Sequence, residues 1–166
     1  MNWRRWIKHE STGKGALAKV LSSKALEGLT QEIAQCEKRH SGEIRLVIET
    51  SLDFNFHWQG VTARERALQV FSHTRVWDTE ANNGVLIYLL LADRDIEIVA
   101  DRGFNKKVSA PVWEKIAVGM EQSFRQNRFE EGLRQGIKEI SQLIEEHFQP
   151  RADDKNELPN APLILG

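Results

Sequence analysis

The sequence predicts an α/β fold, a three-layer α/β/α sandwich around a small mixed sheet. The first observation is an unbroken run of seven apolar residues, Val85 to Leu91, which has strand length and needs cover on both faces. The second is the segment Ile96 to Asp101, whose period of two predicts a strand with one wetter face, and which follows too closely for a parallel crossover and so forms an antiparallel hairpin with the first. The third is a set of amphipathic helical segments before and after this pair, which can cover both sides of the sheet.

Length and composition predict one ordinary domain. The chain has 166 residues, a formal net charge of −1 and one cysteine, Cys36, which excludes an internal disulfide framework and fits a reducing compartment. It has no secretory signal and no apolar run of the roughly 20 residues that span a bilayer, so we expect a cytoplasmic protein, at most peripheral to the inner membrane. Without a basic excess or a glycine-rich phosphate loop, we expect neither nucleic acid nor nucleotide as a partner.

Residues 1–22 are expected to form a basic arm. Trp3 and Trp6 are three positions apart and would share one face of a helix, beside Arg4 and Arg5. Indole rings combined with cations predict a contact with an anionic membrane surface or with a protein partner. The alternative is a short arm whose tryptophans pack on the domain.

The main domain, residues 23–149, begins with a helix and a strand. Ser22 or Ser23 can cap a helix that runs to about Arg39. Its predicted buried stripe consists of Leu26, Leu29, Ile33 and Cys36, and we interpret the cysteine as a packing residue. The strand runs from Glu43 to Thr50, with Ile44, Leu46 and Ile48 on one face and Glu43, Arg45, Val47 and Glu49 on the other.

Residues 51–60 are expected to form a loop. This loop holds three aromatic side chains at alternate positions, Phe54, Phe56 and Trp58. They either cap the edge of the core or line a pocket. A capping box, Thr62 to Glu65, then starts a helix that ends near Trp77. Together with the strands on either side, this helix makes a right-handed parallel crossover, and the antiparallel hairpin follows.

Two C-terminal helices complete the predicted domain. Ser109 caps the first helix, and the second carries apolar residues at helical spacing up to Phe148. Gly132 and Gly136 on the second helix allow another backbone to approach closely. Residues 150–166 are expected to be a mobile tail, whose apolar end either docks back onto the domain or binds a partner.

The stretch around the apolar strand resembles the signature of TPM domains. Asn82-Asn83-Gly84-Val85-Leu86, the apolar run, Asp93-Arg94, a second strand and Gly103 succeed one another as in that family. A weaker resemblance extends from about Leu26 to Phe148, and Arg128 to Leu133 resembles the last TPM helix. The resemblance implies a small α/β domain of the kind found in bacteria and in chloroplast photosystem-repair proteins. It also implies calcium binding, which is reported for the family, and the weak acid phosphatase activity attributed to some members.

Candidate metal ligands gather at the edge where the two parallel strands begin and the third strand ends. We predict a divalent-cation site formed by Asp78, Glu80, Asn82, Asn83 and Asp101, with Glu43 and Arg102 nearby. Hard cations such as calcium take about six to eight oxygen ligands, and this loop can supply several of them. The alternative is that Asp78 caps a turn, that Asn83 is left-handed before Gly84, and that the acids are solvated.

The opposite edge of the predicted sheet gathers a second charged group. It consists of Glu49, Asp53, Asp93, Arg94 and Asp95. Open α/β sheets usually bind ligands at this carboxyl end, and an arginine can hold a phosphate or carboxylate through two hydrogen bonds. Arg94 here and Arg102 at the first edge are therefore the candidate anion-binding residues. The alternative is a charged hairpin turn that protects the sheet from association.

These observations favour a binding module over an enzyme. The sequence has no nucleophile elbow, phosphate loop or zinc-ligand spacing, so we assign no catalytic residue. We expect a TPM-like domain that binds a divalent cation, calcium in the first place, and that takes part in protein interaction or assembly. The alternative is a low-turnover, metal-assisted acid phosphatase, in which Asp78 or Asp101 holds the metal and Arg102 clamps the anion.

Overall fold

The computed structural model describes residues 9, 12, 14–153 and 155–166. Its helices and strands in chain order are α2 (Lys14–Val20), α3 (Ser23–Glu37), β1 (Glu43–Glu49), α4 (Phe54–Gln59), α5 (Ala63–His73), β2 (Gly84–Leu90), β3 (Asp95–Ala100), the 3₁₀ turn η1 (Arg102–Phe104), α6 (Ala110–Arg125), α7 (Phe129–His147) and β4 (Leu163–Leu165). The predicted order of helices and strands is confirmed between α3 and α7, with α4 and η1 as additions.

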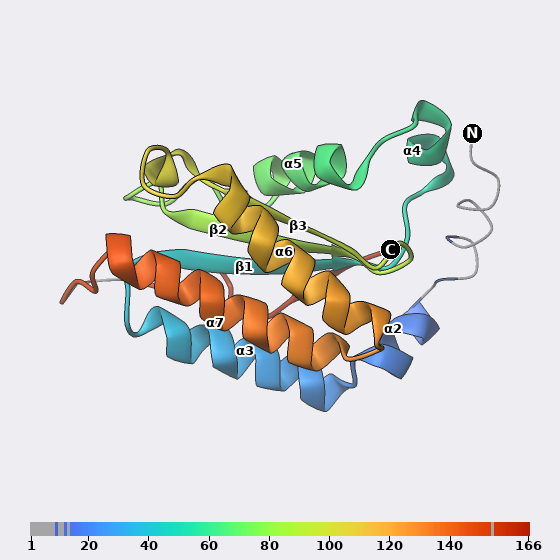
Figure 1. The fold of residues 1–166 in the computed structure, drawn as a ribbon, viewed down its shortest axis with the longest axis horizontal. Coiled ribbons are helices and arrows are strands. Elements are labelled where there is room, and N and C mark those ends of the chain that lie inside the picture. Colours follow the sequence, from blue (N-terminus) through green and yellow to red (C-terminus); the bar gives the residue numbers. More distant parts are fainter. Residues whose placement is uncertain (1–8, 10–11, 13, 154) are drawn as a thin grey trace.

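The four strands form one mixed sheet in the order β3-β2-β1-β4. β1 and β2 are parallel and β2 and β3 are antiparallel, which confirms the predicted crossover and hairpin. One face of the sheet packs against α3, α6 and α7, and the other face packs against α5, so two hydrophobic clusters flank the strands. Figure 1 shows these layers, with α5 on one side of the sheet and α3 and α7 on the other. The structure is therefore the predicted three-layer α/β/α sandwich.

Local signals place the helix starts where the sequence predicts them. The Ser22 side chain caps α3 by accepting a hydrogen bond from the Ala25 N–H. The capping box of α5 is complete, because Thr62 accepts from the Glu65 N–H while the Glu65 carboxylate accepts from the Thr62 N–H. Each of these contacts satisfies a backbone N–H that the first turn of a helix leaves unpaired.

Strand β1 is buried along its whole length, including its charged residues. The Arg45 guanidinium donates to the backbone oxygens of Pro159 and Ala161, and the Glu43 carboxylate accepts from the N–H groups of Glu157 and Leu158. The face that carries these charges is dry because a segment from the C-terminus covers it. Buried charges need such partners, since an unpaired ion loses its hydration without compensation.

The segment that covers β1, residues 157–165, is called the C-terminal strap below. It ends in β4, which pairs with β1 in parallel between Val47 and Glu49. Of the two alternatives for the apolar end of the tail, the structure shows docking back onto the domain. The N-terminal region contributes to the same core, because Leu17 of α2 and Leu21 are buried in the cluster under α3 and α7.

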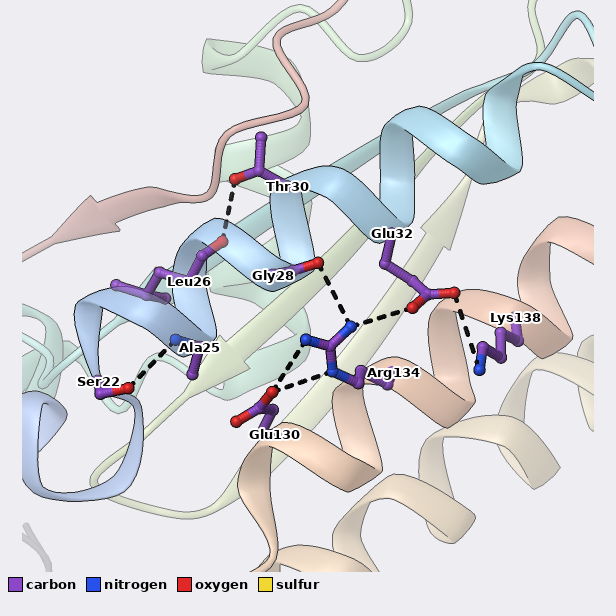
Figure 2. A network of polar contacts seen from close by, with 9 residues as sticks. All are labelled: Ser22, Ala25, Leu26, Gly28, Thr30, Glu32, Glu130, Arg134 and Lys138. Atoms are coloured by element: carbon purple, nitrogen blue, oxygen red, sulfur yellow. Dashed lines mark hydrogen bonds and ion pairs between the residues drawn. The ribbon is translucent and has the colours of Figure 1, made fainter.

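Helices α3 and α7 are joined by a polar network around Arg134, shown in Figure 2. Its guanidinium binds the carboxylates of Glu130 and Glu32 and the backbone oxygen of Gly28, and Lys138 adds a longer ion pair to Glu32. Gly28 has no side chain, and a Cβ at this position would collide with the Arg134 guanidinium. The glycine therefore allows the arginine to reach the α3 backbone.

The segment predicted as a loop, residues 51–60, contains the short helix α4. Phe56 is half-buried and packs on the α5 side of the core, whereas Phe54 and Trp58 are exposed. The expectation that all three aromatic residues cap the core or line a pocket is therefore wrong for Phe54 and Trp58. Their i,i+4 spacing puts them together on the outer side of the helix. Among the helices of the described residues, none combines the length and apolar character needed to cross a bilayer.

Candidate functional site

The amino edge of the sheet, where β1 and β2 begin and β3 ends, brings two predicted segments together. The Gly103 N–H donates to the Asn82 oxygen at 2.8 Å, and the Asp101 N–H donates to the Gly84 oxygen at 2.9 Å. The Arg102 side chain donates through Nε to Asn82 Oδ1 at 2.8 Å. The loop before β2 and the turn after β3 therefore form one continuous surface.

Asp101 is the most informative of the predicted ligands. It caps η1, and its Oδ1 accepts from the Arg102 N–H at 2.7 Å. The residue is 7% exposed, and its other oxygen, Oδ2, is buried without a hydrogen-bond partner among the described residues. A buried carboxylate oxygen normally has a donor or a cation beside it. Asp101 therefore presents a vacant acceptor at this edge.

Asn83 carries a second buried oxygen of this kind, but it faces another direction. Its Nδ2 donates to the Ser41 oxygen at 2.8 Å, and its Oδ1 has no hydrogen-bond partner among the described residues. The register pairs Val85 with Ala100. Because side chains alternate along a strand, Asn83 lies on the same face as Val85, whereas Asp101 leaves from the opposite face. The two vacant oxygens do not converge on one point.

The two carboxylates of the loop, Asp78 and Glu80, are exposed. Glu80 is tied to the C-terminal region, because its carboxylate pairs with Arg151 at 2.6 Å and its N–H donates to Glu157 at 2.9 Å. Over the part of the chain that the structure describes, no group of three or more His, Cys, Asp and Glu side chains could hold a metal ion. Any cation here would therefore rely on amide, backbone and water oxygens as well as carboxylates.

Sequence reasoning missed the part that the C-terminal region plays at this edge. Glu157 and Arg151 lie more than seventy residues from Glu80, with sequence separations of 77 and 71. Neither residue belongs to a motif. Only the folded chain brings them beside the loop, so the sequence offered no signal that could have revealed them.

A hollow of about 550 Å³ opens beside Asp101, between β3 and α6. Phe104 and Trp113 provide its aromatic wall, and Arg64 and Glu97 provide charges on the β3 side. Burial raises the pKa of Glu97, while the nearby Arg64 opposes that shift. The hollow therefore lies next to Asp101, the residue that caps η1.

The carboxyl edge is organised by a buried ion pair rather than by an open anion site. Arg66 binds Glu49 through two hydrogen bonds of 2.9 Å, and the Tyr88 hydroxyl donates to the same carboxylate at 2.6 Å. Burial and the adjacent Glu49 carboxylate raise the pKa of Tyr88. All three side chains have partners, so we interpret this group as part of the scaffold.

The predicted anion-binding arginines lie at opposite edges of the sheet. Arg94 donates to the Phe124 oxygen at 3.2 Å, and its guanidinium lies over the Phe129 ring at 5.7 Å. Arg102 is exposed at the amino edge, beside Asn82. The structure therefore does not bring the two arginines into one site.

The remaining predicted residues fall into two groups. At the carboxyl edge, Asp93 pairs with His9 at 3.2 Å, Asp95 is the first residue of β3, and Asp53 is exposed just before α4. Trp3, Arg4, Arg5 and Trp6 lie outside the described residues. Their predicted contact with a lipid surface or a partner stays a prediction.

Comparisons with known proteins agree with this architecture. A family model described as the TPM domain matches residues 16–143. The NMR structure of the BA42 protein from the psychrophilic bacterium Bizionia argentinensis is 30% identical, with a TM-score of 0.76, and the match covers 87% of this chain and 94% of that chain. The N-terminal domain of a protein from P. gingivalis is 20% identical, with a TM-score of 0.63 and coverage of 81% and 84%, which shows a shared fold. No curated protein matches the chain.

Proposed function

Because the chain belongs to the TPM domain family, we propose that it binds a divalent cation at the amino edge of its sheet and acts as a protein-interaction or assembly module. The observation that carries the proposal is the vacant, buried Oδ2 of Asp101. A carboxylate oxygen removed from water and left without a donor favours a cation at that position. The sequence lacks the hydrolase and nucleotide motifs that would favour turnover.

The donor set fits a hard cation in part. Asp101 supplies the carboxylate, Asp78 is exposed on the facing loop, and the Asn82 oxygens lie against the Asp101–Gly103 turn. Calcium accepts carboxylate, amide, backbone and water oxygens with flexible geometry, whereas zinc prefers Cys and His. Glu80 is engaged by Arg151, and Asn83 faces the other side of the sheet. We therefore propose a weak calcium site centred on Asp101, with water completing the coordination.

A calcium titration of the full chain, followed by backbone NMR, tests this proposal. We expect shifts confined to residues 78–84 and 101–103. In Asp101→Asn the affinity falls at least about tenfold, because the amide keeps the cap on the Arg102 N–H but removes the charge. Asp53→Asn is the matched control, because it removes an exposed carboxylate at the opposite edge. Wild-type spectra that do not respond to calcium would overturn the cation site.

A low-turnover, metal-assisted phosphatase is the second candidate function. It is favoured by the exposed guanidinium of Arg102, which follows the Asp101 carboxylate directly in the chain. A cation and an arginine side by side can bind a phosphoryl group. Hydrolysis of para-nitrophenyl phosphate that requires calcium, and that is lost in both Asp101→Asn and Arg102→Gln at unchanged folding, supports this function. Calcium binding without turnover leaves the binding module as the function.

A further inference from the structure

We propose that α4 is a membrane-docking wedge, which inserts Phe54 and Trp58 into the interface of a bilayer that contains anionic lipid. This surface lies at the carboxyl edge of the sheet and is separate from the proposed cation site. Membrane docking through α4 therefore goes beyond the proposed function, and the failure of either proposal leaves the other unaffected.

The first observation is the exposure of two large aromatic rings. Trp58 is 72% exposed and Phe54 is 52% exposed, and Trp58 is the most exposed of the large apolar side chains in the described residues. Their rings stack with centroids 6.3 Å apart. Two adjacent aromatic rings held in water are unfavourable unless they serve an interaction. Tryptophan in particular prefers the boundary between lipid headgroups and acyl chains.

The second observation is that α4 packs on the domain through Phe56. Phe56, between the two exposed rings, is half-buried against the α5 side of the core. The Arg66 guanidinium lies 4.6 Å from the Phe56 ring and is itself fixed by its ion pair with Glu49. Phe56 therefore faces the core, while Phe54 and Trp58 stay exposed on α4.

The third observation is the position of α4 at an end of the molecule. In Figure 1, α4 and α2 lie at the same end of the longest axis, near the C-terminus. A surface at the tip of an elongated domain can meet a flat bilayer without a clash from the remainder of the fold. Lys19, a residue of α2, is exposed.

The fourth observation is a contact of His9 with the segment just before α4. His9 is buried, and its Nδ1 accepts from the Leu52 N–H at 2.9 Å, two residues before Phe54. Its other ring nitrogen lies 3.2 Å from the Asp93 carboxylate. The sequence that precedes His9 contains Trp3, Arg4, Arg5, Trp6 and Lys8.

Charge decides which partner this surface fits. Within residues 1–24 the basic side chains are Arg4, Arg5, Lys8, Lys14, Lys19 and Lys24, and the acidic one is Glu10. Asp53, just before α4, opposes an anionic partner, as do Asp93 and Asp95 at the same edge, although Asp93 is paired with His9. Lysine and arginine side chains near an anionic leaflet are attracted to it. Apolar insertion and basic attraction are the two signals that stable peripheral binding requires, so a bilayer surface is the occupant that both features fit.

Flotation of the full chain with large unilamellar vesicles tests the proposal. The vesicles contain phosphatidylcholine alone or phosphatidylcholine mixed with phosphatidylglycerol. We expect the wild-type chain to float with the mixed vesicles and to remain in solution with the neutral ones. In Phe54→Ser/Trp58→Ser the partition coefficient falls at least about tenfold, because the apolar contribution is lost.

Trp77→Ser provides the matched control. Trp77 is 48% exposed, and it lies between α5 and the start of β2, at the opposite edge of the sheet. This variant should float like the wild type. Trp58→Phe keeps an aromatic ring and should retain most of the binding, with thermal melts confirming that all variants are folded. The proposal is overturned if the wild-type chain stays in solution with both kinds of vesicle, which is the result expected if α4 docks on a protein instead. Undiminished flotation of the double variant also overturns it.

Discussion

His40 shows how one buried side chain makes the fold sensitive to pH. It lies in the turn after α3, where its Nδ1 is 3.0 Å from the Gly42 oxygen and its Nε2 is 3.0 Å from Ser141 Oγ. Burial lowers the pKa of His40 from 6.5 to about 4, and the Gly42 hydrogen bond only partly opposes this shift. The folded protein therefore holds the neutral imidazole.

This shift predicts a loss of stability in mild acid. The pKa of His40 is lower in the folded state, so the unfolded chain takes up the proton first as the pH falls. The contribution of His40 to the free energy of unfolding is fully present above pH 6.5. It is lost as the pH falls through about 4, and the loss amounts to about 3 kcal/mol. Urea unfolding at pH 7 and at about pH 4.5 measures it. His40→Gln should remove this part of the pH dependence, and His73→Gln, at an exposed histidine, should retain it. Equal pH dependence in all three proteins would contradict the assignment.

At the scale of elements, α6 and α7 approach closely because α7 has glycines on the contact face. A Cβ at Gly132 would lie 2.8 Å from Ser123 Cβ, 3.0 Å from a Phe124 ring carbon and 3.2 Å from the Met120 backbone oxygen. A Cβ at Gly136 would collide with the Met120 side chain. The expected packing role of the two glycines is confirmed.

Two glycine-to-alanine substitutions should therefore have opposite effects. Gly132→Ala should destabilise the fold by about 1–3 kcal/mol, because overpacking outweighs the gain in helix propensity. Gly119→Ala, on the exposed side of α6 with nothing within 4 Å of the new Cβ, should stabilise it by up to about 1 kcal/mol. Chemical denaturation of both variants measures the difference. A stabilising Gly132→Ala would show that the helices can separate at little cost.

At the scale of the whole molecule, the C-terminal strap completes the sheet. Arg45 donates to the Pro159 and Ala161 oxygens at 2.6 and 2.8 Å, so β1 binds the backbone of the strap, and Leu158 of the strap is buried in the same core cluster as Val47 of β1. β4 then extends the sheet beyond β1. The family match ends at residue 143, so the strap lies outside the matched region.

Arg45→Met should loosen the strap while the remainder of the domain stays folded. Loss of two charge-assisted hydrogen bonds should increase amide hydrogen exchange across residues 157–165 by at least about tenfold. Arg64→Met is the control, because Arg64 donates to the Ile98 oxygen of β3, at the far side of the sheet. Unchanged protection of the strap in Arg45→Met would mean that β4 pairing alone holds it in place.

Features that depend on residues close in the sequence were predictable, whereas features that depend on distant residues were not. Caps at Ser22 and Thr62 were predictable because a cap and its target are three residues apart. Helix α4 was missed because its aromatic residues occupy alternate positions, a pattern that does not indicate a helix. In the candidate site, the closeness of Asn82 and Asp101 was predictable from the hairpin, but the vacancy of Asp101 Oδ2 was not. Whether this oxygen has a hydrogen-bond partner depends on the donors that all the neighbouring elements supply.

The sequence by itself determined helices α3, α5, α6 and α7, the central strands and the hairpin, because apolar periodicity and capping residues act within a few positions. Only the tertiary structure decided which charges are partnered and which surfaces are bare. Glu43 meets Leu158 across 115 residues of chain, and the exposure of Trp58 depends on what surrounds α4. The physical reason is that the burial of a charge or a ring is a property of its whole surroundings, and the chain assembles those surroundings only when it folds.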